Sequence, residues 1–170
     1  MELFKDFPVL VVDDDLRSEN TGGRATREIV KELQKRGFSV IESYSGYDCR
    51  IEFMSHSNVS CVLLDWDLVI KPDAEFLGPG EIIEIIRGRN MLIPIFLMTE
   101  KLKVMEIPLE IVSQIDGYVW KLEDSPSFIA GRIEEATERY MDELQPPFLN
   151  ELIRYVDEFK IVRASGRERV

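Results

Sequence analysis

The sequence has few of the residues that build metal or disulfide sites. Only two cysteines, Cys49 and Cys61, and one histidine, His56, occur among its 170 residues. No cysteine pair has CxxC spacing, which argues against a structural zinc site and against a disulfide framework. Cys61 begins an apolar run and is expected in a buried strand, whereas His56 lies in a short polar stretch typical of a surface.

The sequence also lacks an excess of positive charge and a long apolar run. Its 21 Lys and Arg against 32 Asp and Glu leave a net charge of -11, which disfavours binding to nucleic acids or anionic membranes. The opening residues MELFKDFP contain acids where a signal peptide is basic and then apolar. No apolar run approaches the length of a membrane span. We therefore expect a cytoplasmic protein whose partners are other proteins, cations or basic small molecules.

Short apolar runs alternate with amphipathic stretches along the chain. The apolar runs predict strands at 8–12, 39–42, 61–64, 94–98 and 117–120. Apolar residues at helical spacing predict helices at 23–36, 47–54, 81–87, 108–114, 125–144 and 148–159. Continuously apolar strands that alternate with helices are typical of a parallel sheet covered on both faces. We predict an α/β, flavodoxin-like (receiver-like) doubly wound five-stranded parallel sheet in the order 2-1-3-4-5, plus a C-terminal helix.

The length suits one ordinary domain. We expect a receiver-like domain over residues 1–145, a linker-type helix over 146–160 and a flexible tail over 161–170. Pro146 and Pro147 break the chain before the linker-type helix. This helix has an apolar stripe that includes Phe148 and Leu152, and the stripe could pack back on the domain or contact a partner subunit.

Acidic residues end two of the predicted central strands. Asp13, Asp14 and Asp15 follow the first strand, and Asp65 and Asp67 follow the third. Thr99 follows the fourth strand and Lys121 the fifth, so these side chains should meet at one edge of the sheet. Clustered carboxylates favour a hard divalent cation such as Mg²⁺. A carboxylate beside that cation can accept a phosphoryl group, and a lysine and a hydroxyl can bind its oxygens.

This set resembles the active site of response-regulator receiver domains. The resemblance implies that Asp13, Asp14 and Asp65 hold the metal, that Asp65 is the phosphoacceptor, and that Thr99 and Lys121 contact the phosphoryl group. Leu122 stands where receivers usually have proline, and bulky Trp66 follows Asp65. A vestigial or purely structural cluster is the alternative. Trp66 could anchor an interface or simply cover the sheet edge.

Longer segments indicate a narrower relationship. Six segments follow one another over roughly residues 8 to 159. They are VLVVDDD, CVLLDWDL, IRGRNMLIPIFLMTE, EIPLEIV, DGYVWKLEDSPSFIAGRI and RYMDELQPPF. Together they resemble the N-terminal, receiver-like "wing" domain of the bacterial ornithine/lysine/arginine decarboxylases. That family uses pyridoxal phosphate to decarboxylate basic amino acids, and its wing contributes to packing dimers into larger rings.

The resemblance implies a non-catalytic domain that serves assembly or regulation of a decarboxylase. A pyridoxal phosphate enzyme needs a Schiff-base lysine, a partner for the pyridinium nitrogen and a phosphate cup, which these residues do not supply. We expect no cofactor in this chain, apart from Mg²⁺ at the acidic cluster, and no enzyme activity of its own. The expected partners are a second copy or a decarboxylase core. The alternative is a receiver domain that is phosphorylated on Asp65.

Overall fold

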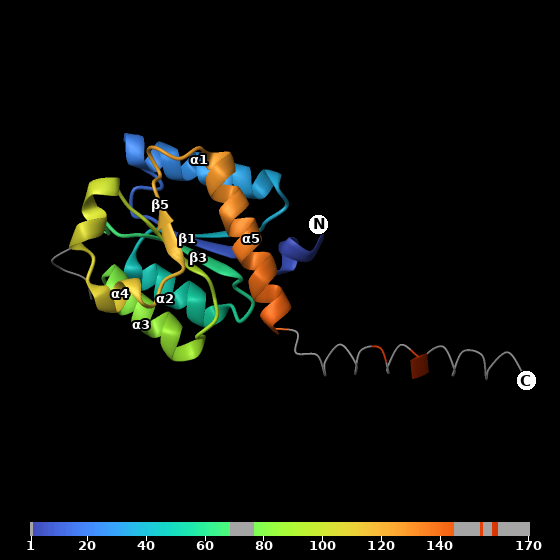
Figure 1. Ribbon diagram of the computed structural model, residues 1–170. Helices are drawn as coiled ribbons and strands as arrows, with labels where there is room; N and C mark the ends of the chain where they lie inside the picture. Colours follow the sequence, from blue (N-terminus) through green and yellow to red (C-terminus); the bar gives the residue numbers. More distant parts are fainter. Residues whose placement is uncertain (1, 69–76, 145–153, 155–157, 160–170) are drawn as a thin grey trace, which may run out of the picture.

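The computed structural model of the protein describes residues 2–68, 77–144, 154 and 158–159. Five parallel strands form one sheet in the order β2-β1-β3-β4-β5, which confirms the predicted topology (Figure 1). The strands are β1 (Val9–Val12), β2 (Val40–Ser43), β3 (Cys61–Asp65), β4 (Ile95–Met98) and β5 (Gly117–Val119). Because all strands are parallel, their carboxyl ends lie along the same edge of the sheet.

Helices cover both faces of the sheet (Figure 1). One face packs against α1 (Thr21–Lys35) and α5 (Pro126–Leu144), and the other against α2 (Gly46–Ser55), α3 (Pro79–Arg89) and α4 (Leu109–Val112). Strand β1 shows why two layers are needed. Leu10 and Val12 enter the core on the α2–α3 side, whereas Val9 and Val11 enter the core on the α1–α5 side. Side chains that alternate between two apolar layers produce the continuous apolar run seen in the sequence.

Side-chain caps set the starts of two helices. The Oδ1 atom of Asn20 accepts a hydrogen bond from the Gly23 amide at 2.7 Å, so α1 begins two residues before the predicted start. Ser45 accepts a hydrogen bond from the Asp48 amide at 3.0 Å and caps α2 in the same way. Gly37, with φ of 95°, follows α1 in the left-handed conformation and confirms the predicted helix stop.

Two 3₁₀ helices were not predicted. They are η1 (Glu2–Asp6) before β1 and η2 (Lys101–Glu106) after β4. Each is short, and neither has the long apolar periodicity from which a helix is read.

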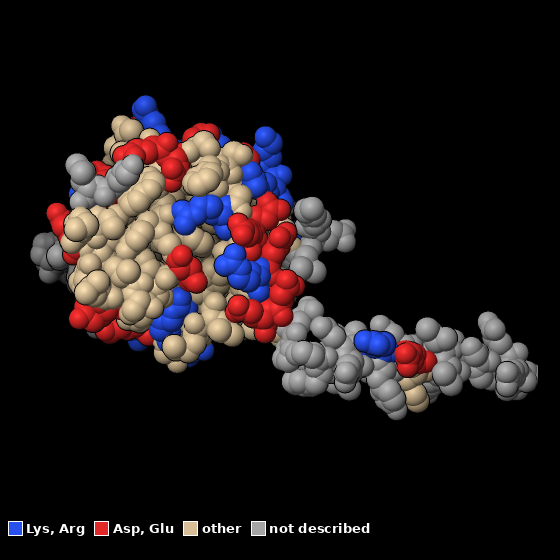
Figure 2. All heavy atoms as spheres, viewed as in Figure 1, with Lys and Arg blue, Asp and Glu red and all other residues tan. Residues whose placement is uncertain are grey.

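Arg36 joins the two helices on one face. Its guanidinium donates to Glu134 on α5 at 2.9 Å and to the backbone oxygen of Ser127 at 3.0 Å. Figure 2 shows acidic and basic side chains along the exposed side of α5, whereas much of the surface to the left of α5 in this view is uncharged. No helix among the described residues is long and apolar enough to cross a membrane.

The predicted linker-type helix at 146–160 and the tail at 161–170 lie almost entirely outside the described residues. Phe148 and Leu152 are among the residues that are not described. Of this region the structure describes only Arg154, Glu158 and Phe159, and the side chain of Phe159 is 57% exposed.

Candidate functional site

The predicted cluster forms at the carboxyl edge of the sheet. Asp13 and Asp14 directly follow β1, and Asp65 is the last residue of β3, the strand that pairs with β1. One carboxylate oxygen from each of Asp13, Asp14 and Asp65 lies within 4.8 Å of the other two. Asp13 and Asp65 are buried, at 0% and 1% exposure. Parallel pairing of two neighbouring strands therefore brings these residues together from positions far apart in the chain.

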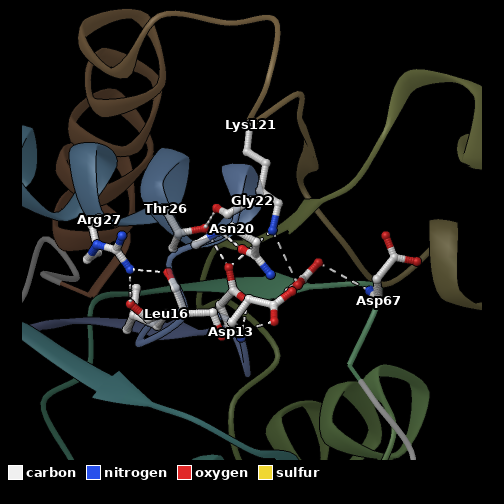
Figure 3. Close-up of polar contacts among 12 residues, drawn as sticks. Asp13, Leu16, Asn20, Gly22, Thr26, Arg27, Asp67 and Lys121 are labelled. Atoms are coloured by element: carbon white, nitrogen blue, oxygen red, sulfur yellow. Dashed lines mark hydrogen bonds and ion pairs between the residues drawn. The ribbon is translucent and has the colours of Figure 1, made fainter.

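Lys121 enters the cluster from the loop after β5 (Figure 3). Its ammonium lies 3.1 Å from Oδ2 of Asp13 and 3.4 Å from Oδ2 of Asp65, and only 11% of its side chain is exposed. The cation thus bridges the two buried carboxylates. Opposite charges held this close, away from water, interact far more strongly than an exposed ion pair.

The buried environment changes the proton affinity of Asp65. Burial is the main cause that raises its pKa to about 7, and the negative charge of Asp13 adds to the rise, while Lys121 opposes it. For Lys121, burial lowers the pKa, but Asp65 and Asp13 together outweigh burial and the pKa of the ammonium is raised. Lys121 is therefore protonated across the physiological pH range, and the proton that moves near neutrality is that of Asp65.

The two glycines at the start of α1 differ in the space around them. A Cβ atom on Gly22 would lie 3.4 Å from Nζ of Lys121, an ordinary van der Waals contact. A Cβ atom on Gly23 would lie 2.1 Å from the backbone oxygen of Asp15. This contact is too close for any residue with a side chain. Because Gly23 is bare, the loop after β1 folds tightly onto α1, and the amide of Asp15 donates to Oδ1 of Asp13 at 2.8 Å.

Sequence reasoning missed Thr26, which lies one turn into α1. Its buried hydroxyl donates to Oδ2 of Asp13, the same oxygen that faces Lys121 (Figure 3). The signal was present, because Thr26 stands three and four residues before Ile29 and Val30 on the apolar stripe of α1. A polar residue on a buried stripe needs a hydrogen-bond partner, which here is the carboxylate of Asp13.

The other candidates lie around the cluster. Thr99 is buried at 2% exposure, and its hydroxyl donates to the backbone oxygen of Glu100 at 3.4 Å. Among the described residues, no hydrogen bond joins Thr99 to the carboxylates. Trp66 is partly buried and packs against the core on the α2–α3 side. Asp67 instead pairs with Lys103 of η2 at 3.1 Å.

The donor set is chemically suited to a hard cation. Carboxylate oxygens are the ligands that hard divalent ions such as Mg²⁺ prefer, and one oxygen of each of these three residues lies within 4.8 Å of the other two. The ammonium of Lys121 already supplies one positive charge between Asp13 and Asp65. The same geometry therefore supports two states, a structural ion-pair cluster and a metal-binding cluster.

Comparison with known proteins decides the family. The sequence model described as "Orn/Lys/Arg decarboxylase, N-terminal domain" matches residues 21–140, most of the folded body. The chain belongs to this family of decarboxylase N-terminal domains. Lysine decarboxylase LdcA of Pseudomonas aeruginosa is 28% identical over 158 residues, which cover 90% of this chain and 21% of that enzyme. The biodegradative arginine decarboxylase of Escherichia coli is 28% identical over 88% of this chain and 20% of that enzyme.

Solved structures agree with the family assignment. Lysine decarboxylase A from Pseudomonas aeruginosa superimposes with a TM-score of 0.70 at 27% identity, covering 90% of this chain and 21% of that one. A response regulator receiver domain protein from Clostridium thermocellum superimposes with a TM-score of 0.62 at 18% identity, covering 82% of this chain and 99% of that one. The second likeness shows the receiver fold alone. The chain spans about a fifth of the length of the curated decarboxylases it matches.

Proposed function

We propose that this decarboxylase N-terminal domain is a non-catalytic module that serves the assembly or regulation of a pyridoxal-phosphate amino-acid decarboxylase. The observation that supports this most directly is the family match over residues 21–140, most of the described body of the domain. A module that recurs at the start of such enzymes has its natural partner in the decarboxylase core.

The protonation state of Lys121 supports a role without catalysis. A Schiff-base lysine must lose its proton to attack a carbonyl, and enzymes achieve this by lowering the lysine pKa. Lys121 lies between two buried carboxylates that raise its pKa. Lys121 and its two carboxylate neighbours therefore do not fit pyridoxal phosphate, which needs an unprotonated lysine.

The test is copurification with a defined partner. The chain carries an affinity tag and is expressed together with the decarboxylase polypeptide of the same organism, and the isolated complex is measured by native mass spectrometry and by the visible absorbance of pyridoxal phosphate. We expect a complex of fixed stoichiometry. The Asp65→Asn variant should copurify equally well, because assembly does not require a phosphoacceptor. Recovery of the chain without the decarboxylase would contradict the proposal.

A second candidate function is supported by the convergence of the acidic cluster. In this alternative the domain is a phosphoacceptor receiver. A carboxylate oxygen of Asp65 attacks the phosphorus of acetyl phosphate, the bond to the acetate oxygen breaks, and acetate leaves. Asp13, Asp14 and Asp65 would hold Mg²⁺, which supplies positive charge to the phosphoryl oxygens. Thr99 and Lys121 would contact the transferred group.

Intact-mass measurement tests the second candidate. The chain is incubated with acetyl phosphate and Mg²⁺, and a phosphoryl adduct is expected in the wild type only. The Asp65→Asn variant keeps the shape of the side chain and removes the nucleophile. An adduct that persists in this variant, or none in the wild type, would rule out Asp65 as the phosphoacceptor.

A further inference from the structure

The outer face of α2 has an exposed apolar stripe. Tyr47, Ile51 and Met54 are 47%, 46% and 43% exposed, and their spacing places them on one side of the helix. Together with Arg50 and Ser55 they line a surface hollow of about 530 Å³. Met54 also lines a second hollow of about 210 Å³, together with Phe53, His56, Ser57, Val59, Arg89, Asn90 and Ile93. The two hollows share Met54 as a lining residue, and we call them together the α2 groove.

The α2 groove is basic in an acidic protein. Arg50 and Arg89 are among its lining residues, and no Asp or Glu is, although the whole chain carries a net charge of -11. Neither arginine has an ion pair or hydrogen bond with another residue in the described part of the chain. An apolar groove with unpaired arginines favours an occupant that is both amphipathic and acidic.

The chain itself contains a segment with this chemistry at residues 148–159. Its apolar residues recur every three or four positions, at Phe148, Leu149, Leu152, Ile153, Val156 and Phe159. Its charged residues are three acids and one base, Glu151, Asp157, Glu158 and Arg154. As a helix, 12 residues extend about 18 Å, close to the roughly 15 Å of the 10-residue helix α2.

Among the described residues, the stripe of α2 is 43–47% exposed, and Phe159, the one described apolar residue of the segment, is 57% exposed. We propose that residues 148–159 of one copy dock in the α2 groove of a second copy, and that the exchange is reciprocal. A reciprocal exchange is symmetric and closes as a dimer. This inference deepens the assembly role proposed above, because it identifies a contact between copies.

The first measurement is the mass of the full chain by size-exclusion chromatography with light scattering, over a range of concentrations. We expect a monomer–dimer equilibrium in the wild type. Ile51→Glu in the groove and Leu152→Glu in the segment should each weaken the dimer at least tenfold. Met105→Glu is the matched control, because Met105 is 92% exposed and lies on η2, away from the groove. It should leave the dissociation constant unchanged.

A mixing experiment separates exchange between copies from docking within one chain. The Ile51→Glu chain keeps an intact segment, and the Leu152→Glu chain keeps an intact groove. Mixed in equal amounts, the two monomeric variants should form a heterodimer through the one intact contact, detected by native mass spectrometry. Circular dichroism of each variant shows that it is folded.

Three outcomes would overturn the inference. They are a wild type that stays monomeric at all concentrations, a mixture that forms no heterodimer, and a Met105→Glu variant that weakens the dimer as much as Ile51→Glu. Failure of the assembly proposal looks different. The chain would then still dimerise alone but would not copurify with a decarboxylase.

Discussion

Lys121 compensates the buried negative charge of the cluster, and its loss should destabilise the domain. Lys121→Met leaves Asp13 and Asp65 buried without their shared cation. Removing one partner of a buried ion pair typically costs about 3–5 kcal/mol, and we expect a loss near the lower value because the side chain is not fully buried. Urea denaturation at pH 8 measures the change. Lys103→Met is the control, because the Lys103–Asp67 pair is partly exposed and should contribute below about 1 kcal/mol.

Asp65 should make the stability of the domain depend on pH. Its pKa is about 7 in the folded protein and 3.8 ordinarily, so between these values the folded state keeps a proton that the unfolded chain has lost. The free energy of unfolding should therefore fall as the pH rises from about 4 to about 7. Asp65→Asn should remove this contribution. Urea midpoints measured at several pH values would falsify the assignment if the wild type and the variant showed the same slope in this window.

At the scale of secondary-structure elements, two helical glycines should respond oppositely to substitution. A Cβ atom on Gly46, the first residue of α2, would lie 2.0 Å from the backbone oxygen of Leu77. Gly46→Ala must therefore displace backbone, and we expect a loss of at least about 2 kcal/mol. Gly88 in α3 has no atom within 4 Å of the same position. Gly88→Ala should raise the free energy of unfolding by about 0.5–1 kcal/mol, since alanine favours the helix.

Thermal and urea denaturation of the two glycine variants measure both effects. Similar stability of Gly46→Ala and Gly88→Ala would show that Leu77 does not pack against the start of α2. A sequence pattern could not distinguish these glycines, because both lie in helices and the contact with Leu77 joins residues 31 positions apart.

At the scale of the whole molecule, the two cores share one sheet and should unfold together. Leu64 is buried on the α2–α3 side, and Ile129 is buried on the α1–α5 side. Leu64→Ala and Ile129→Ala should each cost about 2–5 kcal/mol without changing the denaturant dependence of unfolding. Tryptophan fluorescence and far-ultraviolet circular dichroism should give coincident transitions. Separate transitions would contradict one cooperative unit. Leu109→Ala is the control for burial, because Leu109 is 81% exposed, and an equal loss in this variant would contradict burial as the cause.

The sequence alone determined the architecture and the composition of the cluster. Apolar runs, helical spacing and the acids after β1 and β3 are local patterns. Right-handed crossovers between parallel strands then favour the order 2-1-3-4-5, which the structure has. The start of α1 differs from the predicted start, because the side chain of Asn20 caps the helix two residues earlier. The approach of Lys121 to Asp13 and Asp65 depends on side chains 108 and 56 positions apart.

Only the tertiary structure decided the burial, hydrogen bonds and ion pairs of the acidic cluster. Burial of Asp65 raises its pKa, Thr26 donates to Asp13, and Lys121 lies between the two carboxylates. The α2 groove likewise joins residues from the ends of α2 and α3, which no local pattern brings together. Burial and long-range contact are properties of the folded chain, since they depend on which surfaces meet when the sheet and its two helical layers pack.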